Sequence, residues 1–442
     1  MLRAASDFQP YRDRAAQFDA SRYQPKRRAR VPVPDDEDPW TLPLADFHVG
    51  NPELYKSDRI WPYLARLRDE APVHYCADSQ YGPYWSITRF DDILALDADT
   101  ARLSADSRRG GITINGTPSS GDFLPMFIQM DPPVHDAQRA AVAPRLAPRS
   151  LADLEATIRA RVIDILAALP VNETFDWVPA VARNLTGQMI CTLLGVPVSE
   201  RDKLMTWSDV FSNPDNPELV ASPAVFYNAL ADMGEYFAEL WNQRAQEAPG
   251  FDFISMLAHD PATKDMTPEQ LVGNLVLLIT GGNDTTRNSI TGGLLALHDN
   301  PDQYSKLRDN PGLIPNMVSE IIRWQTPLTH MARTAMTEIE LHGETIREGD
   351  RVVLWYISGN RDPRVIDRPD EFLIDRPRAR HHLSFGFGIH RCLGNRLAEM
   401  QLRVLWEEIL KSGRTIEVAG EPVRLSSPLF HGFSSLPARI TA

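Results

Sequence analysis

Cys392 lies in the segment Phe385–Gly394, which reads FGFGIHRCLG. The three glycines of this segment allow tight turns and a close approach of the backbone to a flat ligand. Cys392 comes just before a predicted helix over residues 393–410, where N–H groups and the helix dipole stabilise a thiolate. A thiolate binds iron and, as a haem ligand, favours O–O cleavage. Taken alone, the residue is better explained as a buried structural cysteine beside a glycine-rich turn.

A second group of candidate site residues lies in the middle of the longest predicted helix, residues 268–298. Gly281, Gly282, Asp284 and Thr285 occur there although glycine, aspartate and threonine are poor helix formers. A packing notch between two helices would explain the glycines. It would not explain an acid directly beside an alcohol.

Several charged residues recur at helical spacing. Glu320 and Arg323 are three residues apart and share one helix face, as do His135 and Arg139, which are four apart. Each pair alone is typical of a solvated surface and contributes little. Whether these residues belong to a functional site therefore depends on other motifs in the sequence.

The pattern Phe-Gly-x-Gly-x-His-x-Cys-x-Gly resembles the haem-binding loop of the cytochrome P450 superfamily, the haem-thiolate monooxygenases. The resemblance implies that Cys392 is the proximal ligand of the haem iron. It also implies that Phe385 shields the sulfur, that Gly386 lets the loop approach the haem, and that His390 donates to a haem propionate.

Other segments resemble the same superfamily in the expected order. Glu320, Arg323 and Arg376 match the residues of a structural network under the haem. Further propionate partners are implied at His135, Arg139 and Arg333. On the long helix, the resemblance implies that Gly281 and Gly282 open a groove for O2, and that Asp284 and Thr285 relay protons for O–O cleavage.

The fold class implied is mainly α with small β-sheets, a single-domain cytochrome P450 fold with haem between the long helix and the cysteine loop. Residues 1–45 are polar and proline-rich and predict an irregular arm, followed by one domain over 46–442. We expect two short strands within 71–90, a hairpin at 339–346 and a strand at 351–357.

The 442-residue chain has a formal net charge of −13, which argues against nucleic acid or an anionic membrane as its main partner. Three cysteines make a disulfide framework unexpected. No apolar leader and no run of membrane-spanning length is evident. We therefore expect a cytoplasmic protein with no transmembrane anchor.

Within the superfamily, ITGGNDTTRNS and WQTPLTHMARTA resemble the bacterial branch that hydroxylates the terminal carbon of alkanes and fatty acids. A branch acting on sterol side chains and terpenoids shares part of this pattern and stays as the alternative. Arg108 and Arg109 are either solvated charges or a grip for a fatty-acid carboxylate. The candidate pocket residues are apolar: Ile112, Ile114, Phe123, Leu124, Leu277, Leu278, Leu328, Met331 and Phe433.

No G-x-G-x-x-G follows a strand, so no flavin or nicotinamide site is predicted. The resemblance implies that electrons from NAD(P)H arrive through a 2Fe–2S ferredoxin and its reductase. Arg391, Arg396 and Arg403 are candidate docking residues for an acidic ferredoxin. A haem-thiolate gas sensor is the alternative outside the enzymes, but it has no use for Asp284 and Thr285.

Overall fold

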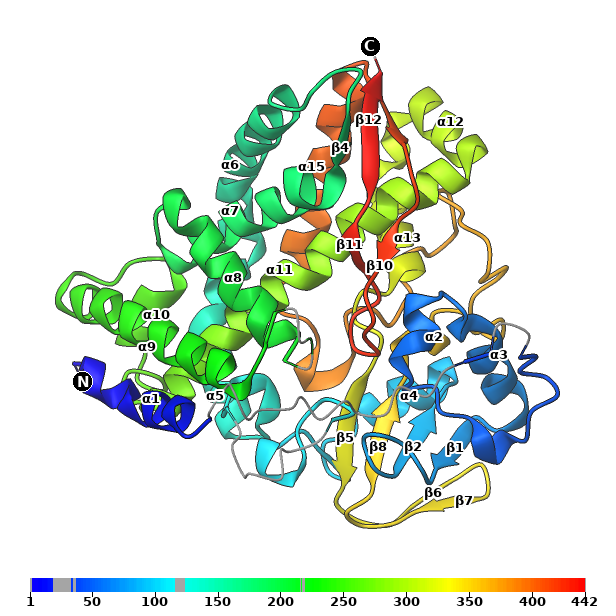
Figure 1. Cartoon of the computed structure of the whole chain (residues 1–442), viewed down its shortest axis with the longest axis horizontal. Helices are drawn as coiled ribbons and strands as arrows, with labels where there is room; N and C mark the ends of the chain where they lie inside the picture. Colours follow the sequence, from blue (N-terminus) through cyan, green and yellow to red (C-terminus); the bar gives the residue numbers. More distant parts are fainter. Residues whose placement is uncertain are drawn as a thin grey trace. The chain divides into compact units, whose positions relative to one another are not determined.

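The computed structural model describes residues 2–18, 33–34, 37–115, 124–214, 216 and 219–441 (Figure 1). They form two compact units, which are described separately. The first unit comprises Leu124–Leu154, Leu185–Asp284 and the described residues before Arg27. The second comprises Glu155–Asn184, Thr285–Ala442 and the residues from Arg28 to Phe123, as far as each range is described.

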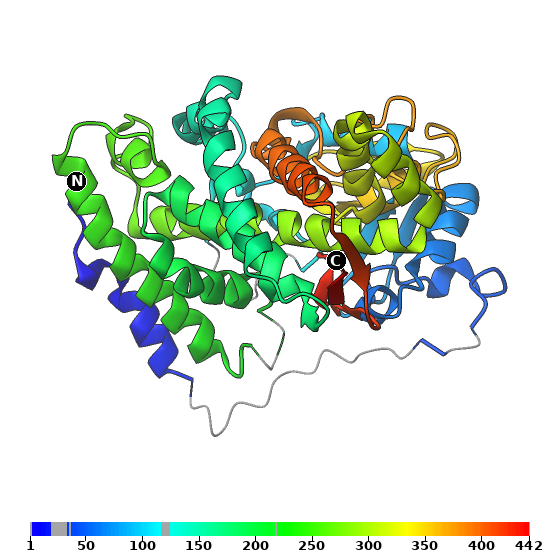
Figure 2. The ribbon, with the colours of Figure 1, turned by 90° about the horizontal axis from the view of Figure 1, so that it is seen from above.

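Helices dominate the first unit. The N-terminal segment, predicted to be irregular, instead forms a 3-10 turn at Ala5–Phe8 and helix α1 at Gln9–Ala16. Figure 2 shows α1 alongside helix α9, Pro223–Gln246. Phe8 is fully buried and Arg12 donates to Asp232 at 2.6 Å, which explains why a polar segment folds here. The other helices are α5 (Val134–Val142), α8 (Arg201–Ser212) and α10 (Phe253–His259).

Three helices have residues in both units: α6 (Pro148–Ala167), α7 (Arg183–Leu194) and α11 (Pro268–Asp299). Helix α11 begins with the predicted capping box, since Gln270 N–H donates to Thr267 Oγ1 and Thr267 N–H donates to Gln270 Oε1. It runs without interruption through Gly281 and Gly282. The poor helix formers at its centre therefore do not break it.

A five-stranded sheet organises the second unit, with strand order β1-β2-β8-β5-β3. The predicted strands at 71–90 are β1 (Val73–Cys76) and β2 (Tyr84–Ile87). They share this sheet with β3 (Leu103–Ser104), β5 (Met331–Ala335) and β8 (Arg351–Leu354), which come from distant parts of the sequence. The prediction of a strand over 351–357 was partly wrong, because α14 begins at Tyr356.

The remaining strands form small sheets. The predicted hairpin is β6 (Ile339–Leu341) with β7 (Glu344–Ile346). A three-stranded sheet and a two-stranded sheet consist of β4 (Thr174–Asp176), β9 (Thr415–Val418), β10 (Val423–Arg424), β11 (Phe433–Ser435) and β12 (Pro437–Thr441).

Helices of the second unit carry most of the expected site residues. α13 (Ile314–Gln325) packs against α15 (Asn395–Lys411), which confirms the predicted C-terminal helix to within two residues. The other helices are α2 (Pro52–Lys56), α3 (Ile60–Glu70), α4 (Phe90–Asp97), α12 (Pro301–Asp309) and α14 (Tyr356–Gly359).

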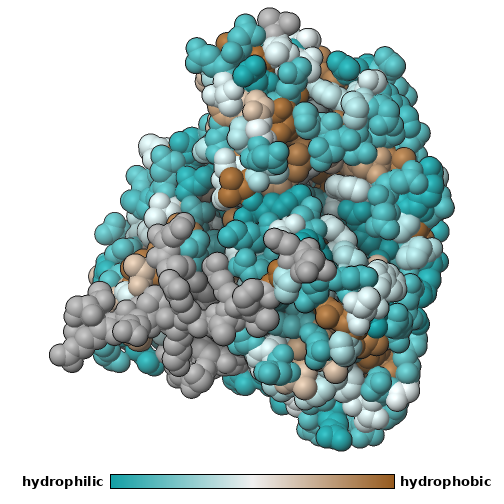
Figure 3. Space-filling view, turned by 45° about the vertical axis from the view of Figure 1, so that its right-hand side comes forward, coloured by the Kyte–Doolittle hydropathy of each residue, from teal (hydrophilic) through white to brown (hydrophobic). Residues whose placement is uncertain are grey.

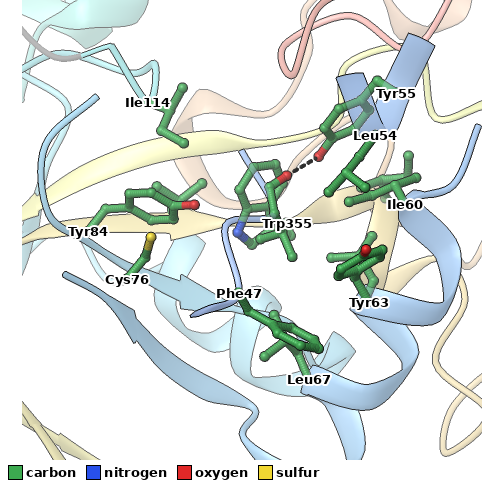
Figure 4. Close-up of a cluster of buried hydrophobic side chains, with 14 of the residues drawn as sticks. Phe47, Leu54, Tyr55, Ile60, Tyr63, Leu67, Cys76, Tyr84, Ile114 and Trp355 are labelled. Atoms are coloured by element: carbon green, nitrogen blue, oxygen red, sulfur yellow. Dashed lines mark hydrogen bonds between the residues drawn. The ribbon is translucent and has the colours of Figure 1, made fainter. Parts of the chain in front are cut away.

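One core cluster of the second unit contains Ile114, Tyr84 and Trp355 (Figure 4). Ile114 is 2% exposed, and its Cδ1 lies 2.6 Å from where a Cβ on Gly50 would be. The side chain therefore fills the space that the glycine leaves. Ile114, predicted to line a substrate pocket, is a core residue.

The outer face seen in Figure 3 is mostly hydrophilic, with apolar side chains scattered over it. Among the described residues, no helix combines the length and the hydropathy required to cross a bilayer.

Candidate active site

The cysteine loop is folded back on itself by backbone hydrogen bonds. The N–H of Cys392 donates to the carbonyl of Phe385 at 2.8 Å, and the N–H of Gly386 donates to Leu383 at 2.7 Å. Gly386 and Gly388 have φ of +65° and +67°, which favours glycine at both turns. The loop ends in α15, and the Cys392 side chain is exposed.

Gly394, two residues after Cys392, has space beside its backbone. A Cβ built there would meet no heavy atom of the described residues within 4 Å. Phe387 is 42% exposed although it is aromatic, and Phe385 is half-buried. An exposed thiol in a loop that also carries accessible aromatic side chains suits a flat apolar ligand that binds through sulfur.

The structure brings Glu320, Arg323 and Arg376 together. Arg323 donates to both carboxylate oxygens of Glu320 at 2.8 Å, and Arg376 Nε donates to Oε2 at 2.9 Å. All three are at most 5% exposed. Their remaining donors reach backbone carbonyls in the segment 360–371, so the network ties α13 to the irregular chain before the cysteine loop.

The expected propionate partners lie on different elements and differ in burial. His135 and Arg139 share one face of α5, with His135 buried and Arg139 half-buried. Burial lowers the pKa of His135 despite its 2.7 Å contact with Asp136. His390 is buried in the second unit. Arg333 lies on β5 and is paired with a residue that the sequence did not suggest, Asp97, at 2.7 Å.

Helix α11 carries an accessible stripe at its midpoint. Gly281 is exposed, and Leu277 and Leu278 one turn earlier are half-buried, whereas residues 271–276 are buried. Among the described atoms, a Cβ on Gly281 would meet only Leu277 Cδ1, at 4.0 Å. Thr285, one turn after Gly281, is half-buried. The stripe leads along one face of the helix to Thr285.

Gly282 has a different role from Gly281. A Cβ there would lie 2.4 Å from Ile190 Cδ1 of α7, so the absence of a side chain allows close helix packing. The packing-notch explanation holds for Gly282. It does not hold for Gly281, where a Cβ would meet no described atom closer than 4.0 Å.

Asp284 is 1% exposed and is held by hydroxyl groups of α8. Ser208 Oγ donates to its Oδ2 at 3.2 Å, and Ser212 Oγ donates to the same oxygen. Asn283 Nδ2 donates to Ser208 Oγ at 3.0 Å, and Thr186 Oγ1 donates to Asn283 Oδ1 at 2.7 Å. Ser212 is half-buried at the end of α8, so a single hydroxyl connects the buried acid to an accessible residue.

Asp97, Ser208 and Ser212 were missed from the sequence, yet each carries a signal. Asp97 falls on the apolar stripe of α4, seven residues after the buried Phe90. Ser208 and Ser212 follow the buried Leu204 at intervals of four on α8. A polar residue on a buried helix face needs a hydrogen-bonding partner, so its position on that face indicates a buried polar contact.

The candidate pocket residues divide by exposure. Phe123 lies outside the described residues. Ile112 and Phe433 are buried at 7% and 1%, and the Phe433 N–H donates to Asn288 Oδ1 at 3.1 Å. The half-buried candidates, which keep accessible apolar surface, are Leu124, Leu277, Leu278, Leu328 and Met331.

The family model for cytochrome P450 matches residues 312–438. Linalool 8-monooxygenase of Pseudomonas putida is 35% identical over 397 residues, which cover 88% of this chain and 97% of that protein. The chain belongs to the cytochrome P450 family. A methyl-branched lipid omega-hydroxylase of Mycobacterium tuberculosis is 31% identical, covering 90% of this chain and 96% of that protein.

Solved structures of cytochromes P450 have the same fold. Cytochrome P450-153 from Novosphingobium aromaticivorans is 42% identical with a TM-score of 0.84, covering 91% of this chain and 99% of that one. CYP153D17 from Sphingomonas sp. PAMC 26605 is 42% identical with a TM-score of 0.83, covering 88% and 98%. The mainly helical fold with small sheets is that of a cytochrome P450.

Membership of this family implies a monooxygenase with haem iron held by a cysteine thiolate and O2 as co-substrate. The residues present fit this group. Cys392 is the only one of the three cysteines within the matched residues 312–438, and its side chain is exposed. Cys392 would hold the iron, and Arg333 and His390 offer buried N–H donors for propionates.

Proposed function

We propose that this cytochrome P450 hydroxylates the terminal carbon of medium-chain alkanes or fatty acids. The observation that carries the proposal is the stripe on α11, where Leu277, Leu278 and Gly281 present only aliphatic or bare backbone surface next to Thr285. Such a surface favours a hydrocarbon chain, at about 0.8 kcal/mol for each buried methylene. The omega-hydroxylase relative also supports attack at a chain end.

Terminal attack requires control of position, because terminal C–H bonds are the strongest in an alkane. Side chains that hold the chain end near the reacting centre can override that difference in reactivity. The space that the described residues leave at Gly281 admits a narrow group, and the isobutyl groups of Leu277 and Leu278 narrow the same helix face. These three residues are the proposed determinants of chain-end selection on α11.

Proton delivery is the second part of the proposal. Bound haem supplies O2 activation and C–H oxidation, a reaction that consumes protons. We assign their passage to Ser212, Asp284 and Thr285. The Ser212 hydroxyl passes a proton to the Asp284 carboxylate and regains one from water, and Asp284 passes it on towards the adjacent Thr285 hydroxyl.

A terpenoid is the alternative substrate class, with a sterol side chain as a related case. The linalool 8-monooxygenase relative favours it, because linalool is a terpenoid alcohol. The gas-sensor alternative finds no support in the hydroxyl network around Asp284, which a sensor does not need.

The substrate class is tested by titrating the purified ferric protein with dodecane, dodecanoic acid, linalool and a bulky sterol. Displacement of water from the iron shifts the visible spectrum from low to high spin. We expect the linear chains to give the shift and to yield products hydroxylated at the end carbon, identified by mass spectrometry. A shift with linalool or the sterol alone would establish the alternative.

The choice between alkane and fatty acid depends on Arg108 and Arg109. Arg108 is 74% exposed and donates to Asp106 at 2.5 Å, so its charge is already paired, while Arg109 is exposed. Arg108→Ala and Arg109→Ala separate the two cases. A carboxylate grip requires that one variant binds dodecanoic acid more weakly than wild type and dodecane equally well.

We propose a 2Fe–2S ferredoxin as electron donor, docking at Arg391 and Arg396. Both are exposed beside the cysteine loop. Arg403, the third predicted docking residue, is instead bound to Glu155 and Glu407 at 2.7 Å and drops out of the proposal. Because docking of an acidic partner is electrostatic, raised salt is expected to slow electron transfer several-fold. A rate independent of salt in stopped-flow reduction would exclude this surface.

A further inference from the structure

Asp97 is a buried carboxylate that joins three separate elements of the second unit. It is the last residue of α4 and is 2% exposed. Its Oδ1 accepts from Arg333 Nη2 on β5 at 2.7 Å. Its Oδ2 accepts from the Tyr356 hydroxyl of α14 at 2.7 Å and from the N–H of Phe387 in the cysteine loop at 2.8 Å.

The charges in this group are matched. A buried carboxylate is unfavourable unless it is paired and hydrogen-bonded, and Asp97 has one cation and two neutral donors. Arg333 is 3% exposed and its Nη1 donates to the carbonyl of Ala332 at 2.8 Å. Burial, and then the charge of Asp97, raises the pKa of Tyr356, so the phenol keeps the proton that it donates.

The cysteine loop lies directly on this group. A Cβ on Gly386 would be 3.2 Å from the Tyr356 hydroxyl and 3.4 Å from Asp97 Oδ2. A Cβ on Gly388 would be 2.7 Å from the backbone carbonyl of Asp97, too close for any side chain. The two glycines therefore let the loop rest on the end of α4, where Asp97 binds its backbone.

We propose that Asp97 is a positioning residue that fixes Arg333 and the cysteine loop relative to each other and sets the charge beside the haem. This inference rests on the proposed roles of Cys392 as iron ligand and Arg333 as propionate partner. With Asp97 in place, the Arg333 cation is largely neutralised. Without it, the loop loses a backbone anchor and Arg333 loses its carboxylate partner, so the net charge beside the haem becomes more positive.

The test compares Asp97→Asn with Asp91→Asn in the full-length holoprotein. Asp91 is an exposed residue of the same helix, so the change in net charge is the same. In Asp97→Asn we expect haem transfer to apomyoglobin to be about tenfold faster, because one partner of a buried ion pair has been removed. We also expect a more positive iron reduction potential, since added positive charge stabilises the ferrous state.

Haem transfer and a potential both equal to those of Asp91→Asn would overturn the proposal. If Asp97→Asn does not fold, Tyr356→Phe decides, because it removes one hydrogen bond to Asp97 and no charge. It should then speed haem transfer about threefold with little change of potential, and an unchanged transfer rate would refute the anchoring role. Failure of the underlying haem assignment is seen separately, as a wild-type ferrous–CO spectrum without thiolate character.

Discussion

The surroundings of Cys392 and the midpoint of α11 are the two regions of the molecule expected to do chemistry, and they are built from different interactions. At the cysteine loop and in the α13 network, buried carboxylates are paired with buried arginines: Asp97 with Arg333, and Glu320 with Arg323 and Arg376. Around Asp284, the partners are neutral hydroxyls and an amide. The first region uses charge to fix a scaffold, whereas the second surrounds one acid with groups that exchange protons.

This difference predicts how each region fails. Removing one charge from a buried matched pair leaves its partner uncompensated, which costs several kcal/mol and threatens the fold. Removing a hydroxyl beside a carboxylate costs less and leaves the helix intact. Variants of the first region should lose haem or stability, and variants of the second should lose product while keeping both.

Glu320→Gln is expected to have the largest effect. Arg323 and Arg376, at 1% and 5% exposure, would then share no counter-charge in the interior. We expect a loss of about 3–5 kcal/mol in the free energy of unfolding, and little holoprotein in the cell. Thermal unfolding, followed by haem absorbance and by circular dichroism, measures the effect.

Glu407→Gln is the matched control for Glu320→Gln. Glu407 also bridges two arginines, Arg159 at 2.6 Å and Arg403 at 2.7 Å, but its side chain is 23% exposed. Solvent screens such a pair, so the expected loss is below about 1 kcal/mol. Equal losses in the two variants would show that burial does not determine how much these ion-pair networks contribute to the free energy of unfolding.

Local patterns in the sequence predicted some parts of the two regions and could not predict the contacts between distant residues. The cysteine loop and the Glu320–Arg323 pair are local patterns, and long amphipathic helices such as α9 and α15 follow from periodicity. Asp97 and Arg333 are 236 residues apart, and no local pattern joins them. Arg333 was expected to face only a haem propionate, and its buried counter-ion appears only in the folded sheet.

Several short elements could not be predicted from the sequence either. Strands of two or three residues carry too few positions for an alternating pattern, and β3 and β4, unlike the hairpin of β6 and β7, have no tight turn to mark them. Helix α1 is polar, so its periodicity gave no signal, and its place depends on Phe8 and on ion pairs with α9. Ile114 looked like any apolar loop residue until the space beside Gly50 was known.

Asp284→Asn is expected to change the reaction and spare the fold. The amide keeps the size of the side chain but cannot carry a proton between Ser212 and Thr285. We expect product formation to fall about 100-fold, with the ferrous–CO spectrum and the thermal stability close to wild type. Oxygen consumption and product are measured together, because electrons that no longer yield product appear as reduced oxygen species. Unchanged coupling of oxygen to product would remove Asp284 from the relay.

Ser212→Ala should lower product formation as Asp284→Asn does, but by less, and should likewise leave the fold intact. Asp284 would keep the Ser208 hydroxyl at 3.2 Å but lose the half-buried hydroxyl that reaches towards solvent. We expect a loss of product of about fivefold and a larger solvent deuterium isotope effect, since proton supply would then limit the rate. Thr206→Ala is the control, because this exposed threonine of α8 donates only to its own helix at Asp202. If Ser212→Ala matches Thr206→Ala in rate and isotope effect, protons reach Asp284 by another route, and the hydroxyls of α8 serve only to hold the acid in place.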